Sequence, residues 1–163
     1  VELERLGTVT GPAGPTTLRF VKLAELSADA SLSVTYVLTH VSGPALSCVF
    51  GSEWNLSPLL FGKDYSPRIS LNGNPAEMST ARLQEDRIEH LSAESAALGL
   101  RVRAEARPAA ALWSVPVEAA SASEKGFERT YQGQCLYFQW PLALRVEETA
   151  RFGLTWRPSG LNQ

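Results

Sequence analysis

Glu53 and Asn55 have the polarity and the spacing to bind a sugar. They lie two residues apart in the stretch FGSEWNLSPLLFG (50–62), where an extended chain places both side chains on one face. A carboxylate beside an amide forms a compact patch that donates and accepts hydrogen bonds, as sugar hydroxyls require. The same two side chains could instead cap the backbone of a neighbouring loop, and both interpretations stay open.

A second candidate surface lies in SASEKGFERTYQGQCLYFQW (121–140), where a charged, Ser- and Gly-containing half precedes an aromatic half. As a loop, the first half is either a solvated connection or a surface for a partner. Phe127 and Tyr131 argue against a merely solvated connection, because exposing their rings to water is unfavourable, and we expect the two rings to pin the loop down. We expect an ordered loop beside the patch of Glu53 and Asn55. Its candidate site residues are Ser121, Ser123, Glu124, Phe127, Glu128, Tyr131 and Gln132.

The sequence contains no pattern typical of a catalytic or metal site. A glycosidase needs two carboxyl groups about 5–9 Å apart, and nothing in the sequence pairs Glu53 with Glu124 or Glu128. A zinc site needs clustered ligands, whereas His40 and His90 are isolated and each is expected in the core. There is no nucleophile elbow and no glycine-rich phosphate loop. We therefore expect no catalytic residue, no metal and no cofactor.

Length and composition are typical of a single folded domain. The chain has 163 residues, 44% of them hydrophobic, which is ample for a core. Its 15 Lys and Arg residues are scattered and the net charge is −2, so nucleic acid is not an expected partner. No apolar run approaches the roughly 20 residues that cross a membrane. Because the first residue is Val1 and the only methionine is Met78, we expect a domain excised from a larger protein.

Cys48 and Cys135 both lie in apolar, strand-like runs. A disulfide between them stays open, because antiparallel neighbours can bring two cysteines within bonding reach. The favoured interpretation is two small buried thiols in a reducing compartment. This interpretation predicts a cytoplasmic location.

Alternation of apolar and polar residues predicts an all-β fold. The clearest case is LGLRVRAEA (98–106), in which apolar residues alternate with Gly, Arg and Glu. Asn72-Gly73-Asn74-Pro75 is a strong turn signal, and only Pro75–Leu83 suggests a weak helical turn. Many strands with short turns predict an antiparallel β-sandwich. The predicted strands are 17–23, 32–38, 45–56, 68–71, 87–91, 98–106, 110–117, 134–144 and 152–156.

Four tryptophans have two interpretations. They could form a stacking platform for pyranose rings, or they could belong to the core. All four fall on predicted strands, in phase with Val, Leu or Phe, which favours the core. We therefore expect Trp54, Trp113 and Trp156 to be largely buried, with Trp140 as the fourth core member.

Two motifs together resemble the C-terminal β-domain of glycoside hydrolase family 57, which contains 4-α-glucanotransferases, α-amylases and amylopullulanases. The family's pattern has an E-(F/W)-N-L strand and, later, a segment P-x-E-T-V-S-x-S-E-x-G-F-E-x-x-Y-Q-G. The matching positions are Glu53, Trp54, Asn55 and Leu56, then Glu118, Ser121, Ser123, Glu124, Gly126, Phe127, Glu128, Tyr131, Gln132 and Gly133. Ala119 and Ala120 depart from the family's Thr and Val, which removes a hydroxyl and some bulk from that surface.

The resemblance covers roughly Leu32 to Trp156 and implies a galactose-mutarotase-like β-sandwich, with the catalytic residues in a separate barrel of the same polypeptide. We expect residues 1–163 to form a single domain of this fold. The chain would then be a non-catalytic accessory domain of an α-glucan-processing hydrolase or transferase. Its expected partners are that barrel and an α-glucan chain. Two other functions stay open: an autonomous carbohydrate-binding module, and a complete small enzyme acting on a sugar.

Overall fold

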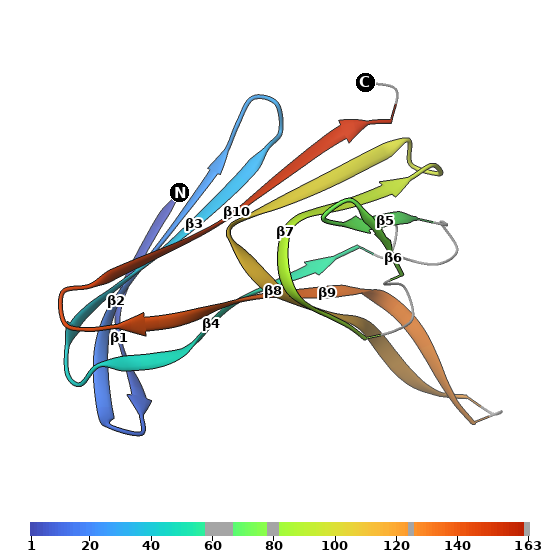
Figure 1. Ribbon diagram of the computed structural model, residues 1–163. Coiled ribbons are helices and arrows are strands. Elements are labelled where there is room, and N and C mark those ends of the chain that lie inside the picture. The colour runs from blue at the N-terminus through green and yellow to red at the C-terminus, as the bar shows by residue number, and fades with distance from the viewer. Residues whose placement is uncertain (58–66, 78–81, 124–125, 162–163) are drawn as a thin grey trace.

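The computed structural model describes residues 1–57, 67–77, 82–123 and 126–161. These residues form ten β-strands and contain no helix (Figure 1), so the all-β prediction is confirmed. The strands are β1 (Glu2–Gly11), β2 (Gly14–Leu26), β3 (Leu32–Ser42), β4 (Leu46–Leu56), β5 (Arg68–Leu71), β6 (Asn74–Ala76), β7 (Leu83–Ser95), β8 (Leu100–Ser123), β9 (Gly126–Leu144) and β10 (Thr149–Gly160).

All strand pairs are antiparallel and belong to one sheet that folds over on itself. The main order is β1-β2-β3-β10-β8-β7-β5-β6, and β4 joins through β9, which pairs with β8. The long strand β8 changes partner midway: Leu100–Arg107 pairs with β10, whereas Ala111–Ser123 pairs with β9. Strand β7 follows β8 through this bend, with register shifts between Glu85 and His90. Bulges of this kind bend a strand and increase its twist.

The fold-over produces two packed layers with an aromatic core between them. Strands β4 and β9 lie across from β3 and β10 (Figure 1). Phe50 and Trp140 of the first pair stack on Phe152 of β10, with ring centroids 5.3 and 5.2 Å away. Trp54 and Trp156 meet at 5.1 Å. Burying a large apolar side chain stabilises the fold by about 1.5–3 kcal/mol. These ring contacts therefore hold the two layers together, as the predicted sandwich requires.

The tryptophan predictions are confirmed except at one position. Trp140 and Trp156 are buried, and Trp54 is half-buried against the core. Trp113 was predicted to be buried, but 46% of its surface is exposed. The segment 110–117 is apolar on both faces, so alternation does not decide which face is inside. The inward face there carries Ser114, which is fully buried.

The two histidines differ from each other. His40 is buried, as predicted, and its Nε2 lies 2.8 Å from the Pro44 carbonyl oxygen. His90 is exposed, which contradicts its predicted place in the core. On β7 the inward-facing residues nearby are Leu91 and Ala93, so His90 has the opposite phase.

Both cysteines are free thiols. Cys135 pairs with Asn55 on β4, seven residues along that strand from Cys48. At about 3.4 Å per residue this is far beyond the reach of a disulfide. Cys48 is exposed and Cys135 is half-buried, so the prediction of two buried thiols is wrong for Cys48.

The expected helical turn at Pro75–Leu83 is wrong at both of its ends. Pro75 belongs to β6 and Leu83 begins β7. Residues 78–81 lie outside the described residues. In the described part of the chain there is no helix with the length and apolar character to cross a membrane.

Candidate functional site

The outward face of the β4–β9 layer presents a row of polar and aromatic side chains across four strands. Directly paired neighbours in a sheet have Cβ atoms about 4.5–5.5 Å apart, so these residues form one continuous strip. We call it the outer row. From β4 through β9 and β8 to β7, it consists of Glu53, Tyr137, Trp113 and Gln84.

The predicted patch of Glu53 and Asn55 is present at one end of this row. Both residues are exposed, and Asn55 Nδ2 donates a hydrogen bond to Glu53 Oε1 at 2.8 Å. The hydrogen bond joins the two side chains to each other, as expected for a compact patch. The free lone pairs and the second amide hydrogen leave capacity for hydroxyl groups of a ligand.

An aromatic pair, in which Trp113 is exposed and Tyr137 is half-buried, continues the row. The rings of Trp113 and Tyr137 have centroids 6.5 Å apart and an interplanar angle of 55°. Tyr137 lies over Gly51 of β4, where an added Cβ would be 2.0 Å from the tyrosine hydroxyl. Gly51 therefore leaves the space that the Tyr137 ring occupies. Partly exposed aromatic rings beside polar groups suit a sugar ring or a protein surface.

A shallow groove lies next to the patch, where β4 ends. Its volume is about 240 Å³. Asn55 and Gln132 both border it, so the structure brings these two predicted site residues together. The lining residues are Asn55, Leu56, Ser57, Val117, Gln132, Gly133 and Gln134.

A β-bulge places Gln132 at this groove. Val117 pairs with Gly133, but the next residue of β8, Glu118, pairs with Tyr131. Gln132 is thus an extra residue on β9. Without it, alternation would put Gln132, rather than Tyr131, on the inward face with Gln134. Bulges often re-aim side chains in this way next to functional sites.

The bulge also creates a polar anchor inside the layer. The Tyr131 hydroxyl donates to Gln134 Oε1 at 2.9 Å, and Gln134 Nε2 donates to Ser114 Oγ at 2.6 Å. Gln134 and Ser114 are fully buried. Burial raises the pKa of Tyr131 to about 12, because it disfavours the phenolate. Tyr131 therefore fixes the base of the β8–β9 hairpin.

Beyond the bulge, β8 and β9 continue as a two-stranded ribbon that projects past the other strands (Figure 1). Residues 118–122 and 126–130 are exposed throughout, and Phe127 is 86% exposed. We call this segment the projecting hairpin. The expected ordered loop is therefore wrong in its structure: the segment forms strands, and Phe127 does not pin it down.

The remaining predicted site residues fall along this hairpin. Ser121 pairs with Glu128, and Ser123 pairs with Gly126 near the tip. Glu124 lies outside the described residues. Among the described candidate residues, Gln132 at the base of the hairpin is the one that borders the groove of Asn55. Tyr131 faces inward to Gln134 instead.

The site contains binding groups rather than an evident reaction centre. In the described ranges, no group of three or more His, Cys, Asp or Glu side chains could hold a metal ion. Sequence reasoning missed Tyr137 and Gln84, and it assigned Trp113 to the core instead of to this face. These residues become neighbours of Glu53 only through the strand register, which no local sequence pattern shows.

Comparison with known proteins identifies a family for this chain. A family model described as "Alpha-amylase/4-alpha-glucanotransferase, C-terminal" matches residues 1–154. A comparison of the sequence with curated proteins gives no match.

Solved structures show the same fold. The 4-alpha-glucanotransferase from Thermococcus litoralis matches with a TM-score of 0.66 and 21% identity, over 96% of this chain and 20% of that one. A putative aldose 1-epimerase from Escherichia coli K12 matches with a TM-score of 0.65 and 16% identity, over 94% of this chain and 64% of that one. A galactose mutarotase related enzyme from Lactobacillus acidophilus matches with a TM-score of 0.58 and 10% identity, over 98% of this chain and 68% of that one. The expected mutarotase-like sandwich is therefore confirmed, and the chain spans about a fifth of the glucanotransferase.

Proposed function

Because the chain belongs to the family of C-terminal domains of α-amylases and 4-α-glucanotransferases, we propose that it is a non-catalytic accessory domain of an α-glucan-processing enzyme. The catalytic residues would lie in a separate barrel of the same polypeptide, of the glycoside hydrolase family 57 type. The two motifs at 50–59 and 116–133 support this finer assignment. The two free thiols support a cytoplasmic location.

The observation that carries the proposal is the projecting hairpin. A two-stranded ribbon without a second layer is only marginally stable in water. This one also presents Phe127, 86% exposed, close to its tip. Docking against the barrel would bury that ring and remove it from water. We propose that the hairpin makes the contact with the catalytic part.

The groove beside Asn55 and Gln132 would then border the glucan. It lies at the base of the hairpin, between the docked tip and the outer row. Amide side chains donate and accept hydrogen bonds, as the hydroxyl groups of a glucose unit do. A glucan chain leaving the barrel along the hairpin would reach these amides first.

The test uses the full polypeptide that carries this chain. Phe127→Ser, and separately the charge reversal Glu124→Lys with Glu128→Lys, should lower its α-glucan activity. The melting temperature of the 163-residue chain should stay nearly unchanged, because surface substitutions rarely exceed about ±0.5 kcal/mol. Leu26→Ser is the control, since Leu26 is also highly exposed, at 75%, but lies on β2. Full activity in both hairpin variants would refute the docking role.

An autonomous carbohydrate-binding module is the second candidate function, and the pair of exposed Trp113 and half-buried Tyr137 beside Glu53 favours it. If this is correct, the chain alone binds maltoheptaose in isothermal titration calorimetry. Trp113→Ala should abolish measurable binding, because it removes the exposed aromatic face on which a sugar ring would pack. If the unaltered chain does not bind, the binding-module function is excluded and the accessory role is the one that remains.

A complete small enzyme is the third function, and the accessory proposal predicts its absence. Incubating the chain with amylose should release no reducing ends, since an uncatalysed glycosidic bond breaks extremely slowly. Release that disappears in a Glu53→Gln variant would overturn the accessory role.

A further inference from the structure

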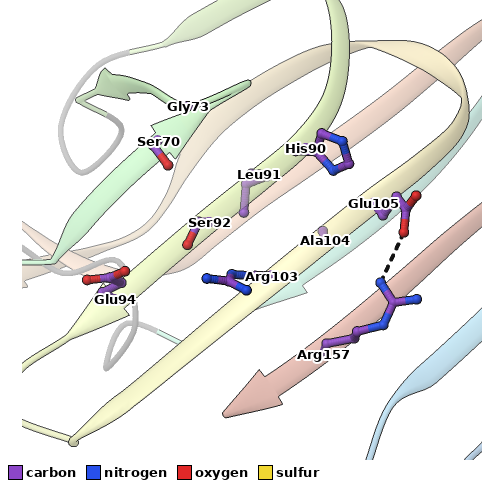
Figure 2. A pocket seen from close by; sticks show the side chains of 10 residues that line it. All are labelled: Ser70, Gly73, His90, Leu91, Ser92, Glu94, Arg103, Ala104, Glu105 and Arg157. Atoms are coloured by element: carbon purple, nitrogen blue, oxygen red, sulfur yellow. Dashed lines mark hydrogen bonds and ion pairs between the residues drawn. The ribbon is translucent and has the colours of Figure 1, made fainter. Parts of the chain in front are cut away.

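A polar cleft lies on the outward face of the other layer, where β5, β7, β8 and β10 run side by side (Figure 2). Its volume is about 460 Å³. It lies on different strand segments from the outer row and shares no residue with the groove of Asn55 and Gln132. Neither the motifs at 50–59 and 116–133 nor the proposed docking surface makes use of it.

Strand register places four hydrogen-bond donors in a single line across the floor of this cleft. Each consecutive pair is directly opposite in the sheet, so the Cβ atoms are about 4.5–5.5 Å apart. Figure 2 shows the two arginines of the line on adjacent strands. We call it the arginine row. From β5 to β10, it consists of Ser70, Ser92, Arg103 and Arg157.

The arginines in and beside this row outnumber the carboxylates that pair with them. Arg157 Nη1 donates to Glu105 Oε2 at 3.0 Å, and Glu105 also pairs with Arg107. Glu94, the other carboxylate of the cleft, is engaged by Arg101 at 2.5 Å. In the described part of the chain no side chain forms an ion pair or hydrogen bond with Arg103.

Two consequences follow for Arg103. Like charges directly opposite each other in a sheet are destabilising, and Arg103 is directly opposite Arg157. Its guanidinium group also has five N–H donors in a fixed fork that matches the oxygens of a carboxylate or phosphate. An anion held between the two arginines would satisfy those donors and remove the repulsion.

We propose that this cleft binds a small oxyanion, a phosphoryl or carboxylate group, between Arg103 and Arg157. Ser92 and Ser70 lie one and two strands beyond Arg103 in the row, so they would face the rest of the molecule that carries the anion, and His90 also borders the cleft. Bidentate contacts from arginine provide most of the affinity and set the orientation of the anion. This site goes beyond the accessory role and does not depend on it.

Isothermal titration calorimetry at constant ionic strength tests the proposal on the 163-residue chain, with three probes. Inorganic phosphate represents the phosphoryl group, D-glucuronate represents the carboxylate, and glucose is the neutral control. Saturable binding of phosphate or of glucuronate is expected, and the tighter of the two identifies the group that the cleft prefers. Glucose should give no saturable binding.

Two variants locate the binding. Arg103→Ala should weaken the preferred anion at least tenfold, and Arg103→Lys should weaken it less, because it keeps the charge but loses the fork. Arg151→Ala is the matched control: Arg151 is an exposed arginine on the same face of β10, six residues from Arg157 and outside the cleft. The affinity of the Arg151→Ala variant for the preferred anion should equal that of the unaltered chain.

Three results would overturn the proposal: no saturable binding of either anion, equal weakening by Arg103→Ala and Arg151→Ala, or equal binding of glucose. Far-UV circular dichroism of Arg103→Ala shows whether that variant is folded. Because Arg103 lies next to a like charge, Arg103→Ala should be folded, and its melting temperature should no longer rise on addition of the anion.

Discussion

Trp140 and Trp113 belong to the same layer of the sandwich, on the neighbouring strands β9 and β8, but they face opposite ways. Trp140 is buried, stacks on Phe152 at 5.2 Å and donates its indole N–H to the Pro108 carbonyl oxygen at 2.9 Å. Trp113 lies on the outside against Tyr137. A shift of one residue along a strand thus separates a core position from a position on the outward face of the sheet. Residue type alone does not distinguish the two.

The largest expected effect follows from the inside face. Trp140→Ala should lower the free energy of unfolding by about 3–5 kcal/mol, because it leaves a cavity among closely packed rings. Trp113→Ala should change it by much less, since that ring is half in water already. Urea denaturation of the two variants measures the difference. Equal losses would mean that the outer aromatic pair is a second core.

The buried polar anchor should give the next largest effect. Gln134→Ala removes a fully buried amide and leaves the Ser114 and Tyr131 hydroxyls without their partner. A buried polar group left unsatisfied costs about 1–3 kcal/mol. Gln132→Ala, two residues away and exposed at the bulge, is the control and should stay within about ±0.5 kcal/mol. Similar losses in both would contradict the inward and outward assignment made by the bulge.

The pH dependence of stability tests the inward position of Tyr131. Its pKa is raised from an ordinary value of 10.0 to about 12 by burial. The folded state therefore retains a proton that the unfolded chain loses, so this contribution to stability is complete below pH 10.0 and is lost as the pH rises towards about 12. In a titration followed at the phenolate absorbance, Tyr131→Phe should remove one late-titrating tyrosine. Removal of an early-titrating one instead would place Tyr131 in solvent.

The strand pattern was predictable from sequence wherever one face is buried and the other is polar, as at 98–106 and 152–156. It was not predictable for β1, which is exposed along nearly all of its length and so has little alternation. The segment 110–117 gave the wrong face for Trp113, because both of its faces are apolar. The Ser-, Gly- and charge-rich residues of the projecting hairpin are typical of a loop, but pairing between β8 and β9 holds them as strands.

The candidate site was predictable in part. Glu53 and Asn55 could be placed together, because residues two apart on a strand share a face. Their neighbours Tyr137 and Gln132 depend on the register of β4 with β9 and on a bulge, which no local pattern encodes.

The smallest expected effect on stability belongs to the projecting hairpin. Phe127→Ser should leave the free energy of unfolding of the chain within about ±0.5 kcal/mol, because the ring is exposed and contributes little to the core. Urea denaturation of this variant and of Trp140→Ala should give the smallest and the largest losses in the free energy of unfolding. A loss above about 1 kcal/mol would mean that Phe127 packs against the domain itself.

Hydrogen exchange of the hairpin amides tests the accessory role most directly. Backbone amides of residues 118–122 and 126–130 should exchange quickly in the 163-residue chain, apart from those slowed by pairing within the ribbon. In the full polypeptide the same amides should exchange much more slowly, because the hairpin is docked against the catalytic part. Amides of the core strand segment 136–142 should show slow exchange in both. Equal exchange of the hairpin amides in the two proteins would contradict docking and, with it, the accessory role proposed for this surface.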